Sequence, residues 1–218
     1  VLDSPFFEER LEQCEELYHS KTKYDELLAY INEYFGGNIG KFINEFYANR
    51  DIIIKDLLSK ESYQMFNISD MNCYKLSGQY PKKNLYTEDM KNKLILCIDL
   101  KKANFQALKY VNKDIVNNAE TYEDFIGGYS NIPYFIESKY NRQVIFGKLN
   151  PSRQITVERF LLEKVHKIII EMMKLDFELF NFGNDELMYF ANNDIQQHFM
   201  ERIEKDIHLL VETEFGTK

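Results

Sequence analysis

Cysteine, histidine and long apolar runs are scarce in this sequence, and each shortage excludes a class of protein. The three cysteines and four histidines among 218 residues match neither a zinc knuckle nor an even set of disulfides. No apolar run reaches the roughly 20 residues that a membrane-spanning helix needs, and no signal peptide is recognisable. No Ser-His-Asp order and no glycine-rich phosphate loop is present. We therefore expect an intracellular protein with no membrane partner, acting in the cytoplasm or, as a viral or phage protein, in that of its host. Because the sequence starts at Val1 and not at Met, we expect a fragment or a processed product.

Composition predicts a folded chain, and its charge is unevenly distributed. Apolar residues make up 44% and aromatic residues 15%, enough to build a core for one domain or for one domain with a helical appendage. The net charge is −8, yet residues 71–153 hold thirteen Lys and Arg against eight Asp and Glu. This basic middle is either a footprint for phosphate groups or chance surface decoration. Within this basic middle, the residues that we expect to contact a nucleic-acid backbone are Lys82, Lys83 and Lys148.

The first part of the chain, residues 1–60, reads as a helical segment. Apolar side chains recur there at helical spacing in three stretches, and the second stretch stops at Gly36-Gly37, a typical helix end. Residues 61–92 are polar and rich in turn residues, which predicts a loop or a short hairpin. The periodic apolar positions are 7, 11, 14 and 17, then 24, 27, 28, 31 and 35, then 42, 46, 53 and 57.

The second part of the chain predicts an α+β fold. The run KLILCIDL at 93–100 is continuously apolar, as in a buried strand, so Cys97 is expected in the core. A helix follows, then an insertion, a long helix around 157–172, and two strands on either side of the turn Gly183-Asn184-Asp185. A helix at 195–207 and a strand at 208–215 close the chain. This order predicts a ferredoxin-like sheet with helices on one face.

Three carboxylates stand at the ends of these strands. Asp99 ends the first strand, and Asp185 and Glu186 lie in the turn of the later hairpin. If the strands pair, Asp99 and Asp185 converge at one edge of the sheet, where two Mg²⁺ or Mn²⁺ ions could hold them together. Taken singly, each is also common in a solvated turn or strand end.

Three short motifs around these residues resemble the palm of right-hand polymerases, and most closely the family A DNA polymerases. The first motif of that family is an apolar strand ending in Asp with a Glu five residues on, and here Asp99 is followed by Asn104. The second is a basic residue, three residues and Phe-Gly on a helix, matched by Arg142, Phe146 and Gly147. The third is His-Asp-Glu between two apolar strands, where this chain has Asn-Asp-Glu at 184–186. The resemblance spans roughly residues 93–192.

The resemblance implies a template-directed nucleotidyltransferase with a polymerase palm at 61–218 and a short fingers-like insertion at about 112–155. Its cofactor would be Mg²⁺ (or Mn²⁺), bound by Asp99 and Asp185, with Glu186 as an accessory catalytic carboxylate. Its partners would be a nucleoside triphosphate and a primed nucleic-acid template, and further polymerase subunits are compatible with it. Nucleotide binding would fall to four residues: Arg142 and Lys139 at the triphosphate, Phe146 at the base, and Asn104 at the position that discriminates against a ribose 2′-hydroxyl.

The chain departs from that family at several positions. Ser138 stands where the family has an Arg, and Asn150-Pro151 replace a Tyr-Gly pair. Only 39 positions separate Phe146 from Asp185, where the family has a long fingers segment. A minimal or divergent polymerase and a palm without activity are both compatible with these changes.

Two other interpretations use the same sheet. The stretch FGNDELMYF also resembles the Gly-Gly-Asp-Glu-Phe domains of diguanylate cyclases, which join two GTP molecules without a template. Those domains carry Asp-x-Asp at the first strand, where Lys101 replaces the second Asp here, and their strand-to-turn spacing is shorter. The other alternative is a catalytically inactive, palm-like structural module of a larger assembly.

Overall fold

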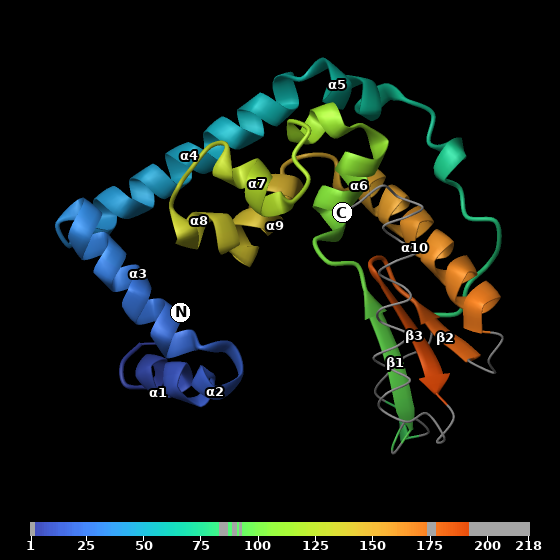
Figure 1. Cartoon of the computed structure of the whole chain (residues 1–218), viewed down its shortest axis with the longest axis horizontal. Helices are drawn as coiled ribbons and strands as arrows, with labels where there is room; N and C mark the ends of the chain where they lie inside the picture. The colour runs from blue at the N-terminus through green and yellow to red at the C-terminus, as the bar shows by residue number, and fades with distance from the viewer. Residues whose placement is uncertain (1–2, 83–86, 89–90, 92, 174–177, 192–218) are drawn as a thin grey trace.

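The computed structural model describes residues 3–82, 87, 88, 91, 93–173 and 178–191. Within these ranges the chain combines many helices with a small antiparallel sheet, so the α+β class is confirmed (Figure 1). The helices are α1 (Phe6–Gln13), α2 (Glu15–Tyr18), α3 (Ser20–Phe35), α4 (Ile39–Ser59), α5 (Glu61–Ile68), α6 (Ala103–Val111), α7 (Tyr122–Gly127), α8 (Pro133–Glu137), α9 (Lys139–Gly147) and α10 (Pro151–Met173), with 3-10 turns η1 (Asn72–Tyr74) and η3 (Lys113–Val116). The strands are β1 (Leu94–Asp99), β2 (Glu178–Phe182) and β3 (Glu186–Ala191).

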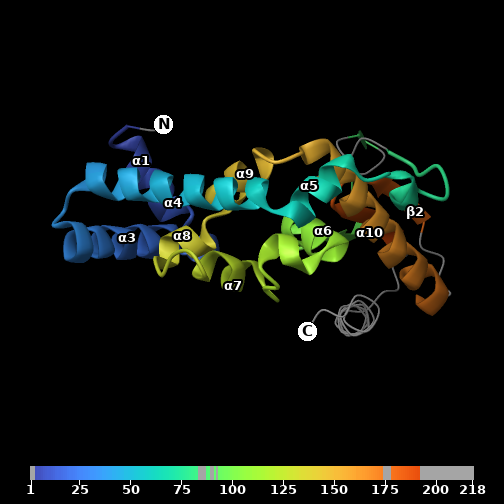
Figure 2. The ribbon, with the colours of Figure 1, turned by 90° about the horizontal axis from the view of Figure 1, so that it is seen from above.

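The helices form an arch. In Figure 1, α4 and α5 cross the top, α3 descends on one side, and α10 descends with the sheet on the other. The α3–α4 corner forms because Gly36 takes a left-handed φ of 59° that suits glycine, as the sequence predicted. Asn38 then caps α4, its side chain accepting a hydrogen bond from the Lys41 amide at 2.9 Å. Seen from above, α3 and α4 lie at one end of the molecule and α10 lies at the other (Figure 2).

The larger core lies among the helices from α3 to the first half of α10. Each large apolar side chain buried there contributes roughly 1.5–3 kcal/mol, so this core holds α7, α8 and α9 against α4 and α6. Its most deeply buried members are Ile53, Leu57, Phe105, Ala107, Leu108, Ile115, Val116, Ile126, Phe135, Ile145 and Val157.

One prediction for this region is wrong. Residues 61–68 were expected in a loop but form α5. Tyr63 and Phe66 are spaced three residues apart and are only 1% and 2% exposed, so one face of a short polar helix is anchored in the core. The Tyr63 hydroxyl also accepts a hydrogen bond from the Asn150 amide at 3.0 Å, which joins α5 to the start of α10.

The sheet has the strand order β1-β3-β2, with both pairs antiparallel. Helix α10 covers one face of it, and α6 packs against α10. The buried residues between α10 and the sheet are Leu96, Leu162, Val165, Ile169, Phe182, Leu187 and Tyr189. The predicted helix at 195–207 and strand at 208–215 lie outside the described residues.

A buried carboxylate on α10 fixes the segment that leads into the sheet. Glu163 accepts hydrogen bonds from the Ser77 amide at 2.7 Å, the Ser77 hydroxyl at 2.8 Å and the Tyr80 hydroxyl at 2.6 Å. Lys167 lies 3.2 Å from its other oxygen, and the Tyr80 ring stacks on Phe182 at 4.3 Å. Burial alone raises the pKa of Glu163, but the bonds from Tyr80 and Ser77 outweigh it and lower the pKa to about 2.

We expect this carboxylate to stabilise the fold near neutral pH. Because the folded pKa lies below the unfolded value, its contribution is complete above about pH 4.5 and disappears as the pH falls towards 2. Between pH 5 and pH 2 the wild type should lose about 3 kcal/mol more free energy of unfolding than Glu163→Gln. Urea unfolding at several pH values measures this difference.

The matched control is Glu137→Gln, which changes an exposed carboxylate at the end of α8. Its stability should follow the wild-type profile across the same pH range. Parallel profiles for wild type and Glu163→Gln would contradict the stabilising role of Glu163.

Candidate active site at the end of the sheet

The pairing of β1 with β3 brings the predicted carboxylates to one end of the sheet. Asp99 lies opposite Glu186 in the register, and the Leu100 amide donates a hydrogen bond to the Asp185 carbonyl at 2.7 Å. The hairpin turn is tight, since the Gly183 amide bonds the Glu186 carbonyl at 2.8 Å. A Cβ at Gly183 would lie 3.1 Å from that carbonyl oxygen, so glycine suits this close approach.

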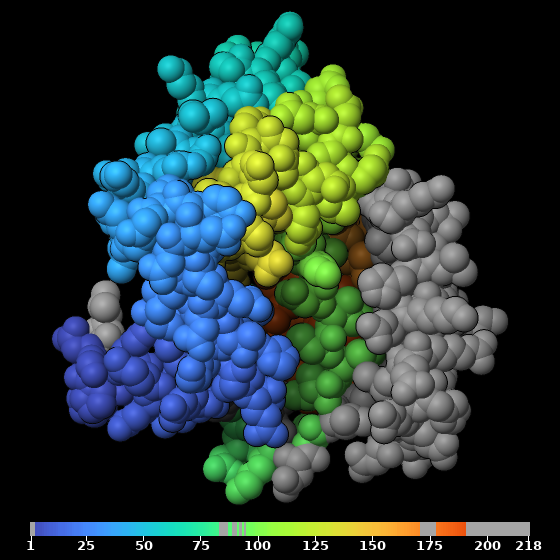
Figure 3. Space-filling view, turned by 60° about the vertical axis from the view of Figure 1, so that its left-hand side comes forward, coloured from blue at the N-terminus to red at the C-terminus, as the bar shows by residue number. Residues whose placement is uncertain are grey.

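The carboxylates Asp99 and Glu186 lie on the sheet face that α10 does not cover. Side chains alternate along a strand, so Cys97 shares this face with Asp99, whereas Leu96 packs towards α10. Cys97 is exposed and its thiol lies 3.8 Å from a Glu186 carboxylate oxygen, so its predicted place in the core is wrong. Burial and the neighbouring charges of Glu186 and Asp99 raise the pKa of this thiol. In the space-filling view a hollow opens between α3, the α8–α9 segment and β1, with orange-red atoms of the hairpin at its floor (Figure 3).

The pKa of Asp99 is shifted by charged groups from other parts of the chain. Partial burial and the charge of Asp185 raise the pKa of Asp99, and the charges of Lys139 and Arg142 oppose that rise. Both cations come from the start of α9, which Ser138 caps by accepting a hydrogen bond from the Asn141 amide at 3.1 Å. Two carboxylates and two cations from separate parts of the chain are therefore within electrostatic reach of each other.

A fourth carboxylate, Glu158, faces this end of the sheet from α10. Glu158 is only 7% exposed, and it makes no hydrogen bond or ion pair with the described residues. Burial, reinforced by the charge of Asp185, raises its pKa to about 7. The motifs did not identify it, but helical spacing could have: Glu158 stands four residues before Leu162 and seven before Val165, on the stripe that packs against the sheet.

The remaining predicted nucleotide-binding residues have mixed positions. Asn104 is half-buried in the first turn of α6, and its side-chain oxygen accepts a hydrogen bond from the Phe105 amide at 2.9 Å. Phe146 is 1% exposed and lies in the helical core beside Tyr122, so its ring is not open to a base in this conformation. Sequence pattern placed Phe146 on the right helix but did not show which side of that helix faces the core.

Two of the three predicted backbone-binding lysines belong to the described residues. Lys82 bridges to Asn181 at the outer edge of β2, and Lys148 is exposed at the C-terminal end of α9. Lys83 lies outside the described residues. Neither Lys82 nor Lys148 is among the charges that shift the pKa of Asp99.

The donor set suits a hard divalent cation. Asp99 and Asp185 offer carboxylate oxygens, and their mutual repulsion is of the kind that a dication relieves. Magnesium commonly binds through one or two carboxylates together with water and substrate phosphates. Among the described residues no cluster of three or more His, Cys, Asp or Glu has the geometry of a metal site.

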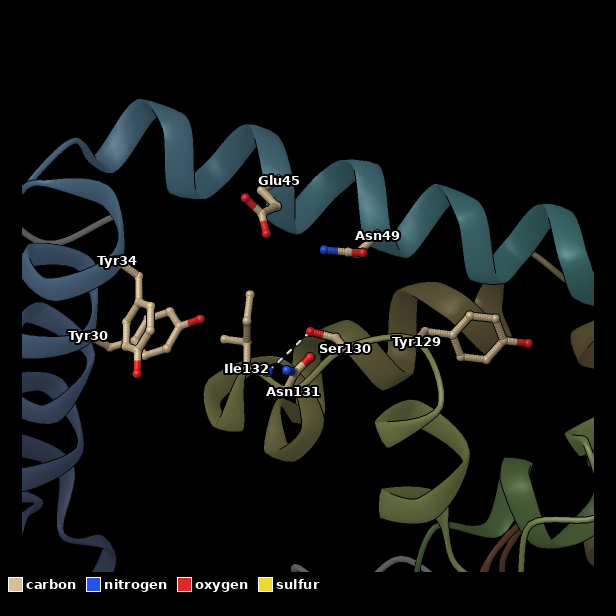
Figure 4. Close-up of a pocket in the computed structure, with 8 residues that line it drawn as sticks. All are labelled: Tyr30, Tyr34, Glu45, Asn49, Tyr129, Ser130, Asn131 and Ile132. Atoms are coloured by element: carbon tan, nitrogen blue, oxygen red, sulfur yellow. Dashed lines mark hydrogen bonds between the residues drawn. The ribbon is translucent and has the colours of Figure 1, made fainter.

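A separate cavity of about 350 Å³ lies at the α3–α4 end of the molecule. Figure 4 shows Tyr30 and Tyr34 of α3 on one side, stacked at 4.5 Å, and Glu45 of α4 above them. Its lining holds a single carboxylate and no Lys or Arg, so it lacks the charges that phosphoryl transfer requires. The full lining is Tyr30, Tyr34, Glu45, Asn49, Tyr129, Ser130, Asn131 and Ile132.

No family model, curated protein or solved structure matches this chain. Within the described ranges, no helix has the length and apolar character to cross a membrane. A functional assignment therefore depends on the geometry at the end of the sheet.

We expect Glu158 to destabilise the fold as the pH rises. Its folded pKa of about 7 lies above the unfolded value, so its contribution is complete below about pH 4.5 and is lost as the pH rises through 7. Glu158→Gln cannot ionise and so does not lose stability in this way. Between pH 4.5 and pH 8 its free energy of unfolding should rise by about 3 kcal/mol relative to that of the wild type. Chemical unfolding in the presence of a chelator measures the difference.

An exposed carboxylate provides the comparison. Glu33→Gln, on the surface of α3, should leave the pH dependence of stability unchanged. If Glu158→Gln also tracks the wild type, Glu158 is already charged or solvated in the folded protein.

Proposed function

We propose that this chain is a palm-like, template-directed nucleotidyltransferase that uses Mg²⁺ or Mn²⁺. The observation that carries the proposal is the meeting of Asp99 with Asp185 at one end of the sheet, with Arg142 and Lys139 in electrostatic reach. This combination matches the needs of phosphoryl transfer, in which cations neutralise charge on the phosphates and carboxylates hold the metal. Its partners in this proposal are a nucleoside triphosphate and a primed nucleic-acid template, with room for further polymerase subunits, in the cytoplasm of a cell or of an infected host.

The sheet also supports a palm. The order β1-β3-β2, antiparallel throughout and covered by helices on one face, is the arrangement of the first three strands in a ferredoxin-like sheet. The face that the helices leave uncovered is the one that we propose for the substrates. Asp99 and Glu186 lie on that face here.

The chain's own residues have distinct roles in this proposal. Asp99 and Asp185 hold the metal, and Glu186 is an accessory carboxylate beside them. When bound, the metal would lower the pKa of the attacking hydroxyl and offset charge on the leaving pyrophosphate. Arg142 and Lys139 hold the triphosphate at the start of α9, where the helix dipole also favours negative charge. The raised pKa of Asp99 fits a carboxylate whose charge is only fully balanced when cations are bound.

The metal-binding pair is tested by substitution. Asp99→Asn and Asp185→Asn should each lower nucleotide incorporation on a primed template by a factor on the order of 10³ or more, because each removes a metal ligand needed in the transition state. Primer extension with Mg²⁺ and with Mn²⁺ measures the loss, and circular dichroism confirms that each variant folds. Asp51→Asn, an exposed carboxylate on α4, should retain full activity. Full activity in both site variants would exclude this site.

Nucleic-acid binding is tested by its dependence on salt. Each lysine that neutralises a backbone phosphate contributes close to one unit to the slope of log affinity against log salt. Replacing Lys82, Lys83 or Lys148 with Ala should therefore flatten that slope by up to about one unit each. Fluorescence anisotropy with a primed duplex at several salt concentrations gives the slope. Lys21→Ala is the control, because Asp25 already neutralises Lys21 at 2.8 Å on α3.

Incubation with GTP alone separates the polymerase from the cyclase. A cyclic dinucleotide product without any primer extension would replace the proposed activity by that of a diguanylate cyclase. If the folded wild-type protein binds neither nucleotide nor duplex, the inactive structural module is favoured.

A further inference from the structure

Tyr122 combines deep burial with a hydroxyl that has nothing to bond. It is the first residue of α7, held in place by a capping box in which Thr121 and Asp124 exchange hydrogen bonds at 3.0 and 3.2 Å. The side chain is 1% exposed, and its hydroxyl is buried without a hydrogen-bond partner among the described residues. Buried hydroxyls are nearly always bonded, so an orphan one next to a candidate site calls for a missing partner.

The surroundings of Tyr122 indicate the charge of that partner. The rings of Phe105 and Phe146 pack against it, and neither can accept a conventional hydrogen bond. The Lys102 ammonium and the Arg142 guanidinium each lie 5.6 Å from the centre of the Tyr122 ring. Two cations and a hydroxyl donor at one position favour an anion.

The two cations differ in whether they are already paired. Lys102 forms an ion pair with Glu123, the residue after Tyr122. Arg142 is half-buried, yet it makes no hydrogen bond or ion pair with the described residues. The Arg142 guanidinium and the Tyr122 hydroxyl therefore both lack an oxygen acceptor among the described residues. Arg142 also lies in electrostatic reach of Asp99.

We propose that the Tyr122 hydroxyl is a further nucleotide-binding group, which donates a hydrogen bond to an anionic oxygen of the triphosphate that Arg142 binds. The inference rests on the proposed function and adds to it a residue outside the sequence motifs. Burial raises the pKa of Tyr122, against the opposing charge of Arg142, so the hydroxyl keeps its proton and acts as a donor at neutral pH. The unpaired hydroxyl lowers the stability of the free protein, and the bound phosphate removes that cost.

Tyr122→Phe tests the proposal because it removes only the hydroxyl oxygen. We expect an unchanged or higher Tm without ligand, since the orphan group is gone. We expect the Kd for triphosphates to rise about ten-fold or more, the size typical of a hydrogen bond to a charged acceptor. Isothermal titration calorimetry with ATP, dATP and inorganic tripolyphosphate, each with Mg²⁺, should show the same fold-change for all three probes.

Tyr129→Phe is the matched control, since it makes the same substitution just beyond the other end of α7. The Tyr129 hydroxyl donates to Asp56 and accepts a hydrogen bond from Asn117 at 2.7 Å. Its loss should lower the Tm and leave the Kd for each probe unchanged. Tyr122→Phe should thus weaken binding without a loss of stability, whereas Tyr129→Phe should lower stability without a change in binding.

The outcomes separate this inference from the proposed function. If the wild type binds none of the three probes, the proposed function fails. If the wild type binds them and Tyr122→Phe binds equally well, only the role of Tyr122 fails. A lower Tm for Tyr122→Phe would show that the hydroxyl already has a partner, and a loss confined to ATP and dATP would exclude a phosphate acceptor.

Discussion

The backbone pairing of β1 with β3 places Asp99 opposite Glu186, and the rest of the candidate site is positioned from that register. A shift by one residue would turn Asp99 towards α10 and the apolar side chains that pack between α10 and the sheet. Two features resist such a shift. The apolar side chains of both strands pack against α10, and Gly183 allows a turn too tight for a side chain at that position. The energy that holds the carboxylates together is therefore hydrophobic and lies on the opposite face of the sheet.

The charges at the sheet end are not balanced within the described chain. Burial is the larger cause of the raised pKa values of Asp99 and Glu158, and the charge of Asp185 adds to the cost of ionising both. Lys139 and Arg142 offset part of this cost from α9. Elsewhere the same chain satisfies its buried carboxylate, since Glu163 receives three hydrogen bonds and a lysine. Glu163 and Glu158 lie five residues apart on one helix, yet only Glu163 has hydrogen-bond and ion-pair partners among the described residues.

Local sequence pattern predicted the elements that build this site but not its complete set of residues. The strands β1 and β3 follow from continuous apolar runs, and α10 follows from its helical periodicity. Cys97 was misplaced because a continuous apolar run suggests burial on both faces, whereas α10 covers only one. The helix α5 was missed because only Tyr63 and Phe66 mark its buried face. Glu158 and Tyr122 belong to the candidate site through tertiary contacts between segments distant in sequence, which no local motif encodes.

The placement of α9 suggests how a short connection could still present a triphosphate-binding surface. Ile145 and Phe146 near the end of α9 are buried in the helical core, and this burial fixes the helix against α4. The first turn of the same helix carries Lys139 and Arg142, whose charges act on Asp99. Burial of Phe146 thus anchors the helix that holds these two cations. For the function that we propose, a buried Phe146 leaves Lys139 and Arg142 to recognise the phosphates, so that discrimination between bases would come from pairing with a template.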